Sequence, residues 1–183
     1  QQEYGAIYED DFWKKQYDGK HGYEILADNT VEELKHIHAV YDLAKEQGDI
    51  TDSSYEALEK RWKDENAERS EKVEKGEVIY GLKEYTFQLY LDYEISTLKE
   101  KYCNDTNREG MKLTEDEIQE HYQSREWIFG DSDENADLEM ARIAVERELR
   151  EQKYDDMITQ RETDSQVAGN MENVNRLTLK NIQ

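Results

Sequence analysis

Side chains that can act in catalysis or bind a metal are abundant in this sequence, but few of them have the spacing that a catalytic or metal site requires. The 183 residues include 45 Asp and Glu, 24 Lys and Arg, 4 His and 1 Cys. One segment begins like a calcium-binding loop, with Asp131, Asp133 and Asn135 at alternate positions. The sixth and twelfth positions, where such a loop needs Gly and Glu, hold Ala136 and Arg142. We therefore reject an EF-hand and expect solvated loop acids.

The histidines and the cysteine also lack the partners that a metal site or a nucleophile needs. His36 and His38 are two residues apart, so on an unbroken helix their rings point to roughly opposite faces and cannot bind one ion. His121 is expected in packing or in solvent. Cys103 excludes an intramolecular disulfide and is expected to be a buried thiol. Hydrolase, phosphate-loop and dinucleotide motifs are missing, so we expect no catalytic residue, no metal and no cofactor.

The aromatic residues form a more informative set. We single out seven as candidates for binding peptide: Tyr80, Tyr85, Phe87, Tyr90, Tyr93, Trp127 and Phe129. Tyrosine and tryptophan suit such a surface because they offer a large contact area and a polar group, with little rotamer entropy to lose. Two interpretations stand side by side. The rings line a groove for an extended apolar peptide, or they form the core between helices, and some residues can do both.

Two helices must position this aromatic set. The first opens at about Tyr85 and has one apolar face with i, i+3, i+4 spacing. Its members are Phe87, Tyr90, Leu91, Ile95, Leu98 and Tyr102. The second begins at a capping box formed by Thr114 and Glu117, with Leu113 and Ile118 placed for a hydrophobic staple. The start of this second helix is therefore specified locally.

The rest of the chain favours an all-α fold. Proline is absent, so long uninterrupted helices are allowed. Further helices are predicted over 9–17, 21–48, 54–75 and 136–163, the last being a long closing helix. The second of these either runs through or restarts at Thr30, which forms another capping box with Glu33, and Gly48 is its expected stop.

The length suits one domain, 1–183, with an N-terminal arm over 1–8, a helical body over 9–163 and a C-terminal tail over 164–183. In the tail, Leu177 and Leu179 alternate with polar residues, which is a weak strand signal. The tail either forms a small β pairing with the arm or is disordered.

The net charge of −21 argues against nucleic-acid and anionic-membrane partners, because both are polyanions. Basic or unfolded apolar polypeptides remain compatible with it. No stretch approaches the roughly 20 apolar residues that cross a bilayer as a helix, so no transmembrane segment is expected. The acidic surface is also expected to provide solubility.

Several short motifs resemble a known family. Tyr80–Gly81, then Tyr85–Phe87 opening a helix, then Leu113–Ile118 followed by His121–Tyr122, are similar to the chaperone domain of SurA- and PrsA-type extracytoplasmic foldases. The resemblance extends over about 9–167. It implies an elongated, multi-helix SurA/PrsA-like chaperone domain that acts at the bacterial cell surface or in the periplasm and binds unfolded or extended polypeptide.

The chain departs from that family at one place. In SurA/PrsA-like proteins the peptidyl-prolyl isomerase domain is inserted before the closing helix. Here the interval is only Gln123–Asn135, far short of the roughly 50 residues of a small domain. We therefore expect a chaperone-like protein without isomerase activity, and no catalytic residue carries over. The alternative is a structural or adaptor module that recognises one folded partner. The client and the oligomeric state are left open.

Overall fold

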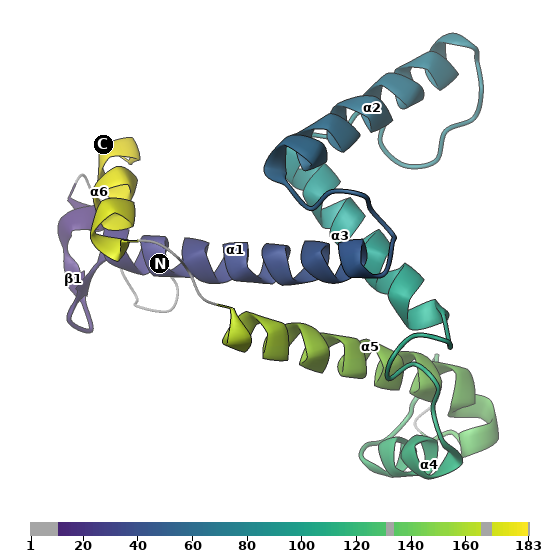
Figure 1. The fold of residues 1–183 in the computed structure, drawn as a ribbon. Helices are drawn as coiled ribbons and strands as arrows, with labels where there is room; N and C mark the ends of the chain where they lie inside the picture. The colour runs from purple at the N-terminus through teal and green to yellow at the C-terminus, as the bar shows by residue number, and fades with distance from the viewer. Residues whose placement is uncertain (1–10, 131–133, 166–169, 183) are drawn as a thin grey trace. The chain divides into compact units, whose positions relative to one another are not determined.

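The computed structural model describes residues 11–130, 134–165 and 170–182 (Figure 1). The fold is mainly helical with one small two-stranded sheet, which confirms the predicted class. The elements are a 3-10 helix Phe12–Lys14, β1 Gln16–Tyr17, β2 Lys20–His21, α1 Gly22–Glu46, α2 Tyr55–Glu74, α3 Phe87–Asn104, α4 Glu115–Gln123, α5 Leu138–Asp164 and α6 Met171–Asn181.

The chain divides into two compact units. The terminal unit comprises Gln1–His38 with Glu162–Gln183, and the central unit comprises Ala39–Arg161. The predicted single domain stays a prediction, because this division does not test which parts fold alone. The predicted arm 1–8 and the start of the loop at Asp131 lie outside the described residues.

The terminal unit contains the sheet, a short antiparallel hairpin in which Gln16 faces His21 and Tyr17 faces Lys20. The predicted helix over 9–17 is wrong for its described part, where a single 3-10 turn is followed by β1. Asp18 and Gly19 have φ of 50° and 85°. Positive φ at both central residues is what a type I′ hairpin turn requires, so this Asp-Gly pair closes a hairpin instead of ending a helix.

Helix α1 runs unbroken past Thr30. The Thr30 hydroxyl donates to the Leu26 carbonyl at 2.8 Å, so it serves the helix interior and does not cap a new start. The helix ends as predicted at Gly48, whose φ is 74°. The Asp49 N–H donates to the Ala44 carbonyl at 2.8 Å, which completes a Schellman motif.

The tail forms α6 and not the predicted strand or disordered segment. The Asn170 side chain accepts from the Glu172 N–H at 2.9 Å, which gives the helix a local start. Met171, Val174 and Leu177 recur every three residues, and this helical spacing prevails over the short alternation that suggested a strand. The small β pairing of the chain therefore lies in β1 and β2.

Helices of the central unit begin where the sequence predicts. Ser54 and Thr86 cap α2 and α3 by accepting from backbone N–H groups at 3.3 Å. The predicted capping box of α4 is present, since Thr114 accepts from the Glu117 N–H at 3.3 Å and Glu117 accepts from the Thr114 N–H at 2.8 Å. The long closing helix α5 is confirmed within two residues at each end.

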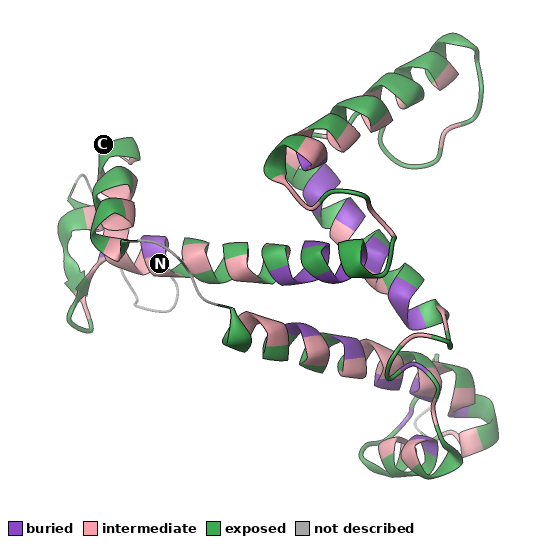
Figure 2. Cartoon of the chain, in the orientation of Figure 1, coloured by how far each residue is buried: buried purple, intermediate pink, exposed green. Residues whose placement is uncertain are grey.

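Buried residues recur along α3 and α5, whereas α2 and α4 bury one residue each, Leu58 and Ile118 (Figure 2). On α3 these include four members of the predicted apolar face, Tyr90, Leu91, Leu98 and Tyr102. A separate cluster joins α4 to α5 through Ile118, Trp127, Ala141 and Val145, with Leu113 packed against it. This packing agrees with the predicted hydrophobic staple.

Trp127 is the largest member of the α4–α5 cluster, with 3% of its surface exposed. Replacement of Trp127 by Ala should lower the free energy of unfolding by about 3–5 kcal/mol, because it leaves a cavity where the indole packs. The neighbouring Ile128 is 50% exposed, and Ile128→Ala should change stability by less than about 0.5 kcal/mol. Urea denaturation of both variants measures this difference, and equal losses would contradict the proposed core role.

Candidate functional site

The connector between α2 and α3, residues 75–86, is held in place by side chains of α2. The Asn66 amide group bonds the Tyr85 backbone twice, accepting from its N–H at 2.8 Å and donating to its carbonyl at 2.9 Å. The Trp62 indole N–H donates to the same carbonyl at 2.8 Å. Arg69 donates to the carbonyls of Tyr80 at 3.1 Å and Leu82 at 2.8 Å. Side chains of α2 thus bond three residues of the connector, Tyr80, Leu82 and Tyr85.

Aromatic rings from α2, the connector and the start of α3 contact one another. The Phe87 ring has its centroid 5.6 Å from that of Tyr55 and 5.6 Å from that of Trp62. Tyr85 stacks on Tyr93 at 5.2 Å. These distances lie in the range of favourable aromatic pairs, so the rings order the surface where α2 meets α3.

This region also exposes large apolar side chains. We name as the α2–α3 surface the following set: Tyr55, Val73, Val78, Tyr80, Leu82, Leu89 and Tyr93. Tyr80 and Val78 are the most open, at 87% and 78% exposed. Tyr55 and Val73 lie at opposite ends of α2, so these exposed side chains are distributed along the helix, the connector and α3. Exposed apolar side chains are candidates for contact with another molecule.

The predicted aromatic set divides between this surface and the core. Ring contacts bring Tyr85, Tyr90 and Tyr93 together, whereas Phe87 contacts Tyr55 and Trp62 of α2. Tyr80 lies on the connector. Tyr90 is nevertheless buried, with 5% of its surface exposed.

The last two members of the set lie elsewhere in the central unit. Trp127 is buried in the α4–α5 cluster, and Phe129, 42% exposed, follows it in the loop before α5. The structure adds Tyr55, Val73, Val78, Leu82 and Leu89, which the sequence analysis did not select. The spacing of seven residues between Tyr55 and Trp62 is the signal that could have placed Tyr55 on the face of α2 that meets α3.

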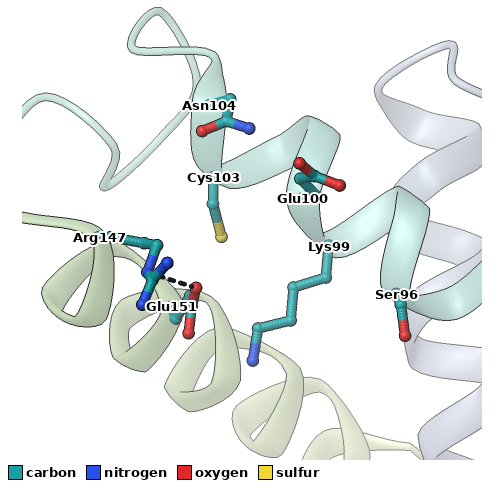
Figure 3. A pocket seen from close by; sticks show the side chains of 7 residues that line it. All are labelled: Ser96, Lys99, Glu100, Cys103, Asn104, Arg147 and Glu151. Carbon is teal, nitrogen blue, oxygen red and sulfur yellow. Dashed lines mark ion pairs between the residues drawn. The ribbon is translucent and has the colours of Figure 1, made fainter. Parts of the chain in front are cut away.

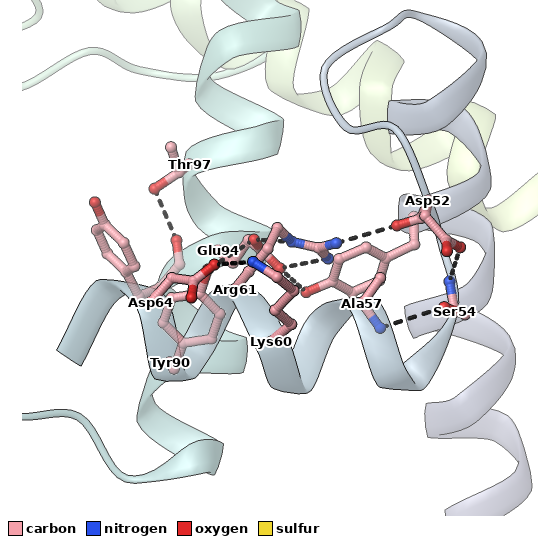
Figure 4. Close-up of polar contacts among 11 residues, drawn as sticks. Asp52, Ser54, Ala57, Lys60, Arg61, Asp64, Tyr90, Glu94 and Thr97 are labelled. Atoms are coloured by element: carbon pink, nitrogen blue, oxygen red, sulfur yellow. Dashed lines mark hydrogen bonds and ion pairs between the residues drawn. The ribbon is translucent and has the colours of Figure 1, made fainter. Parts of the chain in front are cut away.

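Beneath this region Glu94 of α3 is 9% exposed, and its carboxylate accepts four hydrogen bonds (Figure 4). Arg61 of α2 donates from Nε at 2.7 Å and from Nη2 at 3.0 Å. The hydroxyl groups of Tyr41 on α1 and Tyr90 on α3 donate at 2.5 Å and 2.8 Å. A buried carboxylate is tolerated only when it is paired in this way, so one group couples α1, α2 and α3.

Burial and the Glu94 carboxylate both affect the tyrosines of this network. Burial is the main cause that raises the pKa of the Tyr41 and Tyr90 hydroxyl groups well above the usual value of 10. Their hydrogen bonds to Glu94 add to the increase in pKa. Both groups therefore remain protonated donors throughout the physiological range.

A second ion pair links the end of α1 to the loop after α3. Arg108 binds the Asp49 carboxylate with two hydrogen bonds of 2.7 and 2.8 Å, and both side chains are less than 10% exposed. Lys101 lies 2.7 Å from the same carboxylate. The hydrogen bond from Arg108 is the main cause that lowers the pKa of Asp49, although burial opposes it.

An open pocket of about 380 Å³ lies between α3 and α5 and is lined by Ser96, Lys99, Glu100, Cys103, Asn104, Arg147 and Glu151 (Figure 3). Burial raises the pKa of the Cys103 thiol to about 11, so little reactive thiolate forms at neutral pH. Lys99 is bound to Asp155 at 2.6 Å. The pocket therefore shows no activated nucleophile.

Two of the histidines lie beside acidic side chains. His36 lies 2.6 Å from Glu162 within the terminal unit, and His121 lies 3.3 Å from Glu148 and packs against Trp127. In the described parts of the chain, no group of three metal-binding side chains is found. Within the same residues, no helix is both long and apolar enough to span a membrane.

The Glu94 network predicts a large effect of one arginine. Arg61→Ala should lower the free energy of unfolding by about 2–4 kcal/mol, because it leaves the buried Glu94 carboxylate without its cation. Lys60, next in sequence, pairs with Asp64 in solvent, so Lys60→Ala should cost about 0.5 kcal/mol or less. Chemical denaturation of the two variants tests this, and an Arg61→Ala loss no larger than that of Lys60→Ala would contradict it.

The raised tyrosine pKa values predict loss of stability at alkaline pH. A folded-state pKa above the unfolded value favours folding below pH 10, and this contribution is lost as the pH rises above 10. The Tyr41→Phe variant should show a shallower fall in unfolding free energy above pH 10, by up to about 1.4 kcal/mol per pH unit. Tyr80→Phe, at an exposed position, should keep the wild-type slope. Urea denaturation from pH 8 to 11 gives both slopes, and equal slopes for the two variants would contradict the assignment.

Comparison with known proteins finds similarity to a protein of Bifidobacterium longum subsp. longum named "Chaperone for lacto-N-biosidase". The two sequences are 31% identical over 160 residues, which cover 87% of this chain and 57% of that protein. The chain thus spans little more than half the length of its relative. No family model matches the chain, and no solved structure matches it. The SurA/PrsA resemblance therefore stays a prediction, while the chain is similar to a protein that is named as a chaperone.

Proposed function

We propose that this chain is the client-binding part of a protein chaperone that acts outside the cytoplasm. The similarity to a named chaperone over 87% of the chain is the observation that carries the proposal. The client is a secreted enzyme of the lacto-N-biosidase type, and it is bound while unfolded or extended. No isomerase activity is proposed, because the interval between α4 and α5 is too short for a catalytic domain.

The α2–α3 surface is the proposed client site. Three of its apolar side chains, Val78, Tyr80 and Leu82, belong to the connector. Asn66, Trp62 and Arg69 hold this connector in place. A preorganised surface loses little conformational entropy when a client binds. The net charge of −21 keeps a complex with an apolar client in solution.

An adaptor that recognises one folded partner is the second candidate. The name of the relative specifies a single client, which favours a narrow choice of partner over general binding of unfolded chains. The two candidates differ in the state of the client. A chaperone lowers the aggregation of denatured enzyme, whereas an adaptor binds the native enzyme and leaves its refolding yield unchanged.

Refolding of denatured lacto-N-biosidase with and without the chain tests the proposal. The chain should raise the recovered activity and reduce light scattering, and it should not accelerate isomerisation of a prolyl peptide. Replacement of both Tyr80 and Tyr93 by Ser should weaken the effect about tenfold or more, since buried tyrosine contacts contribute about 1–2 kcal/mol each. The apparent affinity is obtained by titrating each variant into the refolding reaction.

A control pair is available on α5, where Met140 and Ile143 are 71% and 86% exposed. Replacement of both by Ser removes similar exposed apolar area away from the connector and should leave chaperone activity unchanged. Equal losses in the two double variants would contradict the placement of the client site. A wild-type chain without any effect on refolding would refute the chaperone function itself.

A further inference from the structure

Arg69 shows how this chain itself holds a guanidinium group. Its Nε donates to the Glu65 carboxylate at 2.8 Å, and its Nη1 donates to the carbonyls of Tyr80 and Leu82 at 3.1 and 2.8 Å. Its Cζ lies over the ring of Tyr85, 4.6 Å from the centroid. The nitrogen atoms of the group therefore make hydrogen bonds while its central carbon makes a cation–π contact.

The ring of Tyr93 also packs on Tyr85. The two ring centroids are 5.2 Å apart and the planes differ by 16°, so one face of the Tyr93 ring is covered by Tyr85. Tyr90 makes a tilted contact with the same ring at 6.2 Å. Tyr93 nevertheless has 42% of its surface exposed. With one face stacked and this much surface open, the other face of the ring is accessible to solvent.

The open face of Tyr93 lacks the cation that other rings of this chain have. Arg108 lies over the Tyr102 ring at 5.0 Å, and Arg125 lies over the Trp127 ring at 4.0 Å. Among the described residues, no lysine or arginine takes such a position over Tyr93. An exposed tyrosine face without a cation of its own chain can accept one from another molecule.

The charges near the two stacked tyrosines in sequence favour a cation. Three acids there make no ion pair with any described residue: Glu84, Asp92 and Glu100. The lysines of α3, Lys99 and Lys101, are both paired with acids of other segments. In the connector and α3, which the structure describes throughout, Lys83 is the one base without an ion pair. The unbalanced negative charge favours a basic side chain over an uncharged ring as the group that packs on Tyr93.

We propose that the open face of the Tyr93 ring binds an arginine side chain of the client. The proposal rests on the chaperone function and names the residue type that the α2–α3 surface selects. Arginine suits this face better than lysine, because its planar guanidinium group stacks on a ring while its N–H groups keep their hydrogen bonds. Leu89, which is 45% exposed and lies one turn before Tyr93 on α3, is placed to contact an apolar residue beside the arginine.

Three fluorescent peptides test the choice of residue. Each has nine residues with valine at alternate positions, and the positions between hold arginine, lysine or citrulline. Lysine keeps the positive charge without the planar group, and citrulline keeps the planar group without the charge. Fluorescence anisotropy on the wild-type chain should show the arginine peptide binding about fivefold or more tightly than either of the others.

Variants of the chain locate the site. Tyr93→Leu removes the ring and should abolish the preference for arginine over lysine, whereas Tyr93→Phe keeps the ring and should keep the preference. Phe129 has the same exposed fraction, 42%, in the loop before α5. Phe129→Leu is therefore the matched control and should also keep the preference. Circular dichroism shows whether each variant is folded.

Nuclear magnetic resonance on the wild-type chain gives a check that needs no variant. The side-chain protons of arginine in the bound peptide should show nuclear Overhauser contacts with the ring protons of Tyr93. Absence of these contacts, equal binding of the arginine and lysine peptides, or a preference that survives in Tyr93→Leu would overturn the proposal. Refolding of lacto-N-biosidase is measured separately, so arginine binding can fail while the chaperone function holds.

Discussion

The carboxylate of Glu94 constrains the central unit more than any other single group described here. A charged group with 9% of its surface exposed requires compensation, and that compensation comes from three helices at once. Because Arg61 must reach Glu94, the face of α2 that bears Trp62 and Asn66 is held against the start of α3. The ends of the connector are thereby positioned. The pair of Asp49 and Arg108 repeats this arrangement at the other end of α3.

The exposed apolar side chains of the α2–α3 surface could make copies of the chain associate with one another. The high negative charge of the chain opposes contact between copies, while it leaves basic client segments attracted. In the proposed function, the exposed aromatic residues contact the client and the acidic surface keeps copies of the chain apart. The bonds from Asn66 and Arg69 to connector carbonyls fix the connector against α2.

Local features of this fold could be predicted from sequence, and long-range ones could not. A helix cap such as Thr114 depends on residues within three positions of it. The apolar residues of α3 recur at helical spacing within one helix. Both signals can therefore be recognised in a short stretch of sequence. Arg61 and Glu94 are 33 residues apart, and neither stands out among 69 charged residues. The hairpin was missed because Asp18-Gly19 serves equally as a helix stop. Trp127 and Tyr93 both belong to the predicted aromatic set, and only packing separates the core residue from the exposed one.

The single thiol of the chain has a further consequence. Cys103 is 5% exposed and faces α5, where its Sγ lies 3.7 Å from the Arg150 carbonyl. The same thiol lines the open pocket between α3 and α5, so a thiol reagent small enough to enter that pocket approaches it from there. With one cysteine in the sequence, alkylation of the folded chain reports on this one position. A rate that falls as the reagent becomes larger would measure how far the pocket admits other molecules.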